Sequence, residues 1–192
     1  ALATPGWGTA LAPVYVLHER GVPLHVWVDE TRPRMQGARL TMWELMQAGI
    51  PCTLVPDGAA GILMQRRRVH ACIVGADRVA RNGDVANKVG TFMLALCAKR
   101  HGVPFYVAAP TSTIDMSIRD GIAEIPVEER SADEVLTVGV WTGDEEIVGR
   151  IAPEKSVAVN FAFDITPHDL IAALITERGV FAPADIAASS GG

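Results

Sequence analysis

Short apolar runs alternate with amphipathic stretches along most of this chain of 192 residues. Continuous short runs are typical of buried strands, whereas apolar residues three and four positions apart indicate a helix with one buried face. The runs predict strands at residues 23–28, 52–55, 69–74, 104–109 and 157–160. The amphipathic stretches predict helices at residues 9–20, 86–100 and 167–176, and two more that end before Gly49 and at Arg66.

This alternation predicts the fold class. Strands separated by helices pair in parallel, because each helix carries the chain back across the sheet. We therefore expect residues 1–182 to form a doubly wound, mainly parallel α/β sheet with helices on both faces. Residues 115–154 have weaker periodicity, as is typical of a lid or surface excursion, and residues 183–192 are a linker-like tail.

Composition and charge narrow the range of partners. Hydrophobic residues make up 49% of the sequence, which is enough for a substantial core. The formal net charge is −5, and the only dense basic cluster, Arg66-Arg67-Arg68, is expected to be a solvated helix end. Nucleic-acid binding requires a basic surface, so we expect no nucleic-acid partner. No apolar run approaches the ~20 residues that cross a bilayer, and we expect no membrane partner.

Cysteines and histidines are spaced unlike those of disulfide frameworks or metal centres. Cys52, Cys72 and Cys97 form no C-x-x-C pair, so we expect reduced thiols in a cytoplasmic protein. The five histidines show none of the common zinc spacings. We therefore expect neither a metal nor another cofactor.

The residues best suited to chemistry lie between Val74 and Thr91, where a predicted strand passes through a polar loop into a predicted helix. Ligands of open α/β sheets bind at the carboxyl ends of the strands, so charged residues here are expected to face a substrate. Asp77 follows the strand and is a candidate acid or base. Asn87 and Lys88 fall in the predicted first turn of the helix, where free backbone N–H groups help to hold a phosphate.

Simpler interpretations exist for several residues of this stretch. Asp84 can favour the helix N-terminus through the macrodipole without contacting a ligand. Asn82-Gly83 is first of all a turn signal, because both residues tolerate positive φ. Taken alone, Lys88 is an ordinary solvated charge and Asp77 an ordinary loop acid.

The run from Val74 to Thr91 resembles the signature of 5-methylthioribose-1-phosphate isomerases, which are relatives of regulatory subunits of the eukaryotic initiation-factor exchange complex. The resemblance covers nearly all of the chain and implies the Rossmann-like carboxyl-terminal domain of that family. It implies that Asp77 is the catalytic acid or base and that Gln36 binds the substrate. Two arginines near Gln36, Arg32 and Arg39, are expected to be structural and to pair with nearby acids.

Such an enzyme converts an aldose phosphate to a ketose phosphate by moving hydrogen from C2 to C1, as a proton through an enediol or as a hydride, and both routes remain open. The reaction needs a group that manages protons and a clamp for the phosphate. Asp77 supplies the first, and Asn87 and Lys88 supply the second. The anomeric oxygen of the substrate is esterified, so the enzyme must assist ring opening.

The resemblance has three further implications. A strand that carries a catalytic cysteine is expected immediately before Ala1, with a smaller helical domain before it, so the 192 residues are expected to be an inactive fragment. A homodimer is expected. Two alternative functions remain: a ribose-1,5-bisphosphate isomerase, and a non-catalytic regulatory subunit that senses a sugar phosphate or nucleotide.

Overall fold

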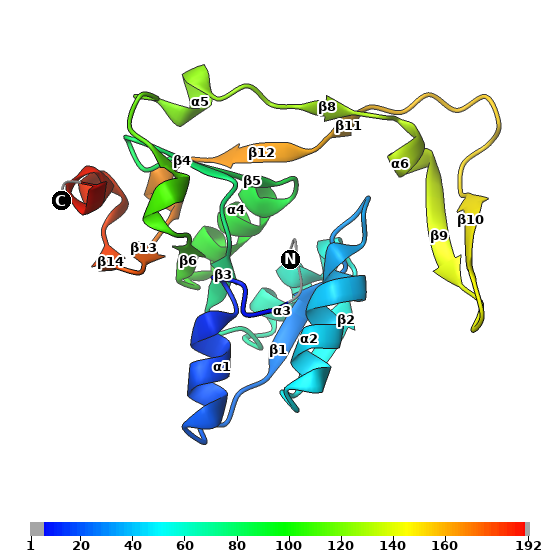
Figure 1. Cartoon of the computed structure of the whole chain (residues 1–192), viewed down its shortest axis with the longest axis horizontal. Helices are drawn as coiled ribbons and strands as arrows, with labels where there is room; N and C mark the ends of the chain where they lie inside the picture. The colour runs from blue at the N-terminus through cyan, green and yellow to red at the C-terminus, as the bar shows by residue number, and fades with distance from the viewer. Residues whose placement is uncertain (1–5, 191–192) are drawn as a thin grey trace.

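The computed structural model describes residues 6–190 (Figure 1). A body of strands and helices occupies most of the molecule, and a strip of extended chain leads from it to a projecting hairpin (Figure 1). The carboxyl-terminal segment lies at the side of the body opposite to this hairpin (Figure 1). Within the described residues, no helix is long and apolar enough to span a membrane.

The amino-terminal part of the body is built on one parallel strand pair. Strand β1 (Val26–Asp29) pairs in register with β2 (Cys52–Val55). Helix α1 (Ala12–Glu19) precedes β1, and a π-helix, η1 (Gly37–Thr41), continues directly into α2 (Met42–Gln47) before β2. A small apolar core joins these elements through Leu11, Tyr15, Val28, Leu45 and Ile50.

A four-stranded sheet forms the centre of the body. Its order is β14-β13-β6-β3, with β3 at Cys72–Val74, β6 at Phe105–Ala108, β13 at Ala173–Thr176 and β14 at Gly179–Phe181. Strands β3, β6 and β13 run parallel, and β14 returns antiparallel to β13. The central strand is buried because its neighbours pair along both of its edges: Phe105, Val107 and Ala108 are at most 1% exposed.

Helices cover this sheet and complete the main core. Helix α3 (Ala60–Gln65) follows a 3-10 turn, η2 (Asp57–Ala59), and packs against α4 (Thr91–His101). A further 3-10 segment, η5 (Pro183–Ser190), adds Ile186 to the same core. The buried residues of this core include Met64, Cys72, Val79, Val85, Ala95, Ala98, Phe105, Val107 and Leu174.

A second four-stranded sheet lies between the body and the strip, in the order β12-β5-β4-β7. It comprises β4 (Arg78–Ala80), β5 (Val85–Lys88), β7 (Ile114–Asp115) and β12 (Phe163–Thr166). Strand β5 pairs antiparallel with both β4 and β12. This sheet holds the stretch that the sequence marks as chemically important.

The strip and the hairpin come from residues with weak periodicity. The strip contains α5 (Gly121–Glu124), β8 (Glu129–Arg130), α6 (Asp133–Leu136) and the returning β11 (Asn160–Phe161), which pairs with β8. The projecting hairpin consists of β9 (Thr137–Trp141) and β10 (Glu146–Arg150). Arg39 fastens the hairpin to the body by binding Gly139 O and Glu146.

The predicted α/β class with parallel strands and covering helices is confirmed, and residues 52–55 form a strand with the predicted bounds. The predicted helix over residues 86–100 is wrong at its start. Residues 85–88 form β5, and α4 begins only at Thr91. Gly90 separates the two with φ +103°, a left-handed conformation that interrupts a helix.

The predicted helix over residues 167–176 is also wrong. Thr166 and Pro167 lead only into a short 3-10 turn, η4 (His168–Leu170), after which the chain enters β13. Pairing with β6 overrides the capping signal, because it buries Leu174 at 2% exposure in the main core. The strand predicted at 157–160 begins later, since only Asn160 falls within β11.

Candidate functional site

Asp77 lies in the loop between β3 and β4, directly beside β5. Its backbone N–H donates to Ala86 O of β5 over 2.9 Å, which fixes the loop against that strand. Its side chain reaches solvent, yet partial desolvation raises the pKa of Asp77, and the positive charges of Lys88 and Arg130 oppose this rise. A carboxyl group of raised pKa that remains accessible is suited to exchanging a proton with a ligand.

Lys88 is the last residue of β5 and lies opposite Phe163 of β12. Its Nζ atom is 4.9 Å from the centroid of the Phe163 ring. Desolvation, followed by the positive charge of Arg130, lowers the pKa of Lys88, while Asp77 acts in the opposite direction. The structure therefore brings Asp77 and Lys88 near one another, as the sequence predicts, but Lys88 lies at the end of a strand and not on a helix.

Asn87 is adjacent to Lys88 but its amide is engaged within the chain. Its Nδ2 donates to Thr91 Oγ1 over 3.0 Å, and that hydroxyl donates to Lys88 O over 2.6 Å. These bonds fasten the turn between β5 and α4. Asn87 thus positions the backbone of Lys88.

The amino terminus of α4 differs from the expected phosphate cradle. Gly90 N donates to Asp164 Oδ2 over 2.7 Å, and Phe92 N donates to Asp164 Oδ1 over 3.1 Å. Asp164 on β12 therefore caps the helix from a neighbouring strand. These two N–H groups are occupied, so the expectation that free N–H groups at the start of this helix help to hold a phosphate is wrong for them.

Gln36 lies on another element, immediately before η1. A close approach of Gly37 to β1 fixes it there, since a Cβ at Gly37 would lie 1.7 Å from Asp29 O. The Oε1 atom of Gln36 is buried and has no hydrogen-bond partner among residues 6–190. No hydrogen bond within residues 6–190 links Gln36 to Asp77. The same loop carries Arg34, however, whose charge also lowers the pKa of Lys88, so this loop borders the Lys88 side of the site.

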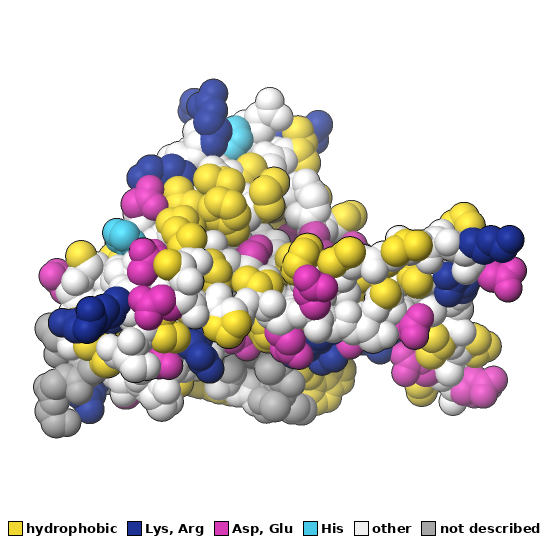
Figure 2. Space-filling view, turned by 90° about the horizontal axis from the view of Figure 1, so that it is seen from above, with side chains coloured by type: hydrophobic (Ala, Val, Ile, Leu, Met, Phe, Trp, Pro, Cys, Tyr) yellow, Lys and Arg dark blue, Asp and Glu magenta, His cyan; other side chains and the backbone are white. Residues whose placement is uncertain are grey.

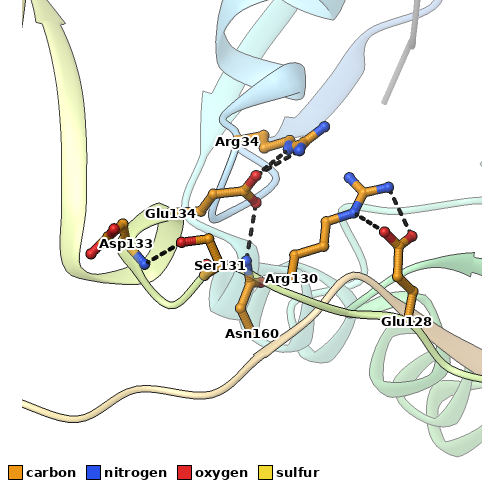
Figure 3. A network of polar contacts seen from close by, with 7 residues as sticks. All are labelled: Arg34, Glu128, Arg130, Ser131, Asp133, Glu134 and Asn160. Atoms are coloured by element: carbon orange, nitrogen blue, oxygen red, sulfur yellow. Dashed lines mark hydrogen bonds and ion pairs between the residues drawn. The ribbon is translucent and has the colours of Figure 1, made fainter.

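A network of polar and charged residues links the loop that carries Arg34 to the strip (Figure 3). Arg34 binds Glu134 of α6, and the other oxygen of Glu134 accepts from Asn160 Nδ2 over 3.0 Å. Beside them, Arg130 binds Glu128 (Figure 3). The guanidinium carbon of Arg130 is 5.3 Å from the Phe163 centroid, so Lys88 and Arg130 flank one aromatic ring.

Sequence reasoning missed Arg34, Glu128, Arg130 and Asp164 as residues of this region. The signal for Arg130 was its position within the charged run Glu128-Glu129-Arg130, but weak periodicity hid the fact that this run forms a strand. Its pairing with β11 depends on residues about thirty positions further along the chain.

Asp84 has a structural role that differs from the predicted one. It is 1% exposed and lies in the turn between β4 and β5, where it does not cap α4 but lies beside the first residues of α5 and η4, Gly121 and His168. His168 N and His168 Nδ1 each approach its Oδ1 at 2.9 Å, and Asn82 Nδ2 donates to its Oδ2 at 2.7 Å. Burial opposes ionisation, but these hydrogen bonds outweigh it and lower the pKa of Asp84. Asn82-Gly83 forms the turn, as predicted, with Gly83 at φ +88°.

The two arginines near Gln36 are structural, as expected, but with other partners. Arg32 donates to the backbone oxygens of Val135 and Thr137, and Arg39 binds the hairpin. Within residues 6–190, no group of three histidine, cysteine or acidic side chains is arranged to hold a metal ion.

Comparison with known proteins identifies relatives of this chain. Residues 4–183 match the model of the initiation factor 2 subunit family. The chain is 58% identical over 182 residues to a methylthioribose-1-phosphate isomerase of Roseiflexus castenholzii, covering 95% of this chain and 49% of that protein. It is 57% identical over 179 residues to a methylthioribose-1-phosphate isomerase of Gluconobacter oxydans, covering 93% of this chain and 49% of that protein.

Two crystal structures share the fold. A 5-methylthioribose 1-phosphate isomerase from Pyrococcus horikoshii superposes with a TM-score of 0.86 at 46% identity, covering 98% of this chain and 50% of that one. The delta subunit of translation initiation factor eIF-2B from A. fulgidus superposes with a TM-score of 0.83 at 45% identity, covering 96% and 51%. The chain thus spans about half the length of the relatives it matches. With the family model matched over nearly its whole length, this chain belongs to the initiation factor 2 subunit family.

Proposed function

We propose that the full-length protein converts 5-methylthioribose 1-phosphate to 5-methylthioribulose 1-phosphate, an aldose–ketose isomerisation in methionine salvage. The main support is the identity of 57–58% to proteins named methylthioribose-1-phosphate isomerase. The geometry agrees with this chemistry, because an acid of raised pKa, Asp77, lies beside a partly desolvated cation, Lys88.

Each predicted site residue has a role in this proposal. Asp77 exchanges a proton with a substrate oxygen as the ring opens, a role that its raised pKa favours. Lys88 binds the phosphate as a point charge, and Asn87 holds the Lys88 backbone and offers Oδ1 to a sugar hydroxyl. Gln36 offers the unpaired Oε1 and its amide N–H groups to another hydroxyl.

We also propose that the complete domain includes one more strand, which carries a catalytic cysteine and lies between β1 and β3. Among the described residues β1 pairs only with β2, and β3 only with β6. Unpaired strand edges inside a sheet leave backbone polar groups unsatisfied. A cavity of about 650 Å³ supports this placement, because residues of β1 and of the segment before β3 line it, including His25, Trp27, Arg68 and His70.

We further propose that the full-length protein is a cytoplasmic homodimer. Hydrophobic side chains are spread over the projecting part of the molecule, where Figure 1 places β9 and β10 (Figure 2). Trp141 is 70% exposed and Val148 is 67% exposed. Apolar side chains on such an arm favour contact with another subunit. Cys52, Cys72 and Cys97 are free thiols, which is typical of a reducing compartment.

A turnover assay tests the proposed function against its alternatives. The full-length protein is expected to convert 5-methylthioribose 1-phosphate and to act poorly on ribose 1,5-bisphosphate, which demands a second phosphate clamp. The alternative of a non-catalytic regulatory subunit is supported by the similarity to an initiation-factor subunit. Binding of a sugar phosphate without turnover of either compound would favour that alternative and would refute the isomerase proposal.

A further inference from the structure

Two cations of the candidate site, Lys88 and Arg130, lie against the same aromatic ring, that of Phe163. Lys88 Nζ lies against the Phe163 ring, and within residues 6–190 it forms no ion pair with a carboxylate. Arg130 approaches the same ring and lowers the pKa of Lys88 further. Two like charges in a partly desolvated site repel one another. An anion that binds between them reduces this electrostatic repulsion.

The guanidinium of Arg130 is held in a fixed orientation by one carboxylate. Arg130 Nε and Nη2 each donate to Glu128 over 3.1 Å, one to each oxygen. These bonds use two of the five N–H groups of a guanidinium. The side chain of Arg130 is 22% exposed, against 54% for Glu128, so the arginine faces the interior of the site and the acid faces solvent.

A contribution to stability alone does not explain this arrangement. An ion pair with an acid as exposed as Glu128 contributes little, because water screens it. Within the described residues, the remaining N–H groups of Arg130 form no hydrogen bond with the protein. The Arg130 guanidinium and the Lys88 ammonium contact the same Phe163 ring, at 5.3 Å and 4.9 Å from its centroid, so both cations border one region.

We propose that Arg130 binds the phosphate of the substrate together with Lys88, and that Glu128 positions its guanidinium for this contact. The inference rests on the proposed sugar-phosphate function and adds two residues to it. Lys88 supplies a point charge, whereas the planar guanidinium supplies parallel N–H donors that match two phosphate oxygens. The strip that carries β8 is then part of the substrate site.

The test uses the full-length protein and three variants of similar size change. Arg130→Gln removes the charge, Glu128→Gln removes the acid that orients it, and Arg100→Gln removes an exposed charge on α4 as a control. We would measure kcat and KM for 5-methylthioribose 1-phosphate, the dissociation constant of inorganic phosphate by calorimetry, and the thermal midpoint of each protein.

Arg130→Gln is expected to raise both KM and the phosphate dissociation constant by about tenfold or more, with kcat changed much less, since one charge-assisted contact is lost. Glu128→Gln should raise both values by a smaller factor, and Arg100→Gln should change neither. Parental phosphate affinity in a folded Arg130→Gln protein would overturn the inference while leaving the isomerase function intact.

The remaining outcomes are also decisive. If the parent binds phosphate without isomerising the substrate, the proposed function fails and the phosphate affinities still decide the role of Arg130. If Arg130→Gln does not fold, unchanged phosphate affinity in Glu128→Gln counts against the inference. A parent that isomerises the substrate but binds no phosphate overturns the inference and leaves the isomerase function intact.

Discussion

The backbone N–H of Gly90 donates a hydrogen bond of 2.7 Å to the carboxylate of Asp164. Asp164 lies opposite Asn87 in the pairing of β12 with β5, so this bond ties the strand to Gly90, the residue that immediately precedes α4. Desolvation raises the pKa of Asp164, and the hydrogen bonds from Gly90 and Phe92 oppose that rise. The turn that follows Lys88 therefore depends on a residue more than seventy positions away.

Asp164→Ala is expected to destabilise the protein by about 1–2 kcal/mol, the usual cost of losing a helix cap. KM should rise as well, because the turn that positions Lys88 loosens. Chemical denaturation and steady-state kinetics of the full-length protein measure the two effects. Asp144→Ala, at the exposed tip of the hairpin, is the control. Equal stability of the two variants would contradict the capping role.

Asp77→Asn is expected to reduce kcat at least a hundredfold with little change in KM, because general acid–base catalysis contributes roughly that factor or more. Lys88→Ala should chiefly raise KM, because it removes a binding charge. Steady-state kinetics of both variants check this division of roles. Near-normal kcat in Asp77→Asn would show that another group manages the proton.

Gly37→Ala is expected to displace the segment that carries Gln36. The added Cβ would lie 1.7 Å from Asp29 O, a backbone atom that cannot move without shifting β1. We expect a lower thermal midpoint and a raised KM. Gly58→Ala, where a Cβ meets no atom within 4 Å, is the matched control. A Gly37→Ala protein with parental stability would mean that the loop adapts freely.

Stability should depend on pH through Asp29. Burial, and then the charge of Asp57, raises the pKa of Asp29 to about 6. The folded state thus retains this proton where the unfolded chain, with a pKa of ~4, releases it. The contribution is complete below ~4 and is lost as pH rises through about 6, by at most ~3 kcal/mol.

Asp29→Asn, which cannot ionise, should lack this loss. Thermal midpoints of the two proteins between pH 4 and pH 7.5 are expected to diverge as the pH rises, with the parent losing more stability. Parallel curves would show that Asp29 ionises normally in the folded protein.

The full-length protein is expected to be a homodimer in which the β9–β10 hairpin contacts the other subunit. Light scattering at micromolar concentration measures the mass directly. Trp141→Ser combined with Val148→Ser should weaken the dimer, because it removes two of the most exposed apolar side chains of the hairpin. The double substitution Asp144→Ser with Glu145→Ser, at the tip, serves as its control. A monomeric mass for the parent would refute this part of the proposal.

The sequence by itself determined the α/β class, the strand at residues 52–55 and the turn at Asn82-Gly83. Local signals suffice there. A short apolar run between turn residues is most readily buried as a strand, and Asn-Gly readily adopts positive φ. Asn82-Gly83 lies between the apolar pairs Val79-Ala80 and Val85-Ala86, a pattern that also indicates the β4–β5 hairpin. The helical spacing of apolar residues after Ala86 favours a helix instead, and the prediction followed that spacing.

Only the tertiary structure decided where the charges meet. Lys88 and Arg130 are 42 positions apart in sequence, and both contact the ring of Phe163 of β12. Asp164 takes the N–H groups that a phosphate was expected to use, and β6 draws residues 173–176 into a strand. These outcomes depend on pairing between distant segments, whose burial outweighs local propensity, so no pattern within one segment reveals them.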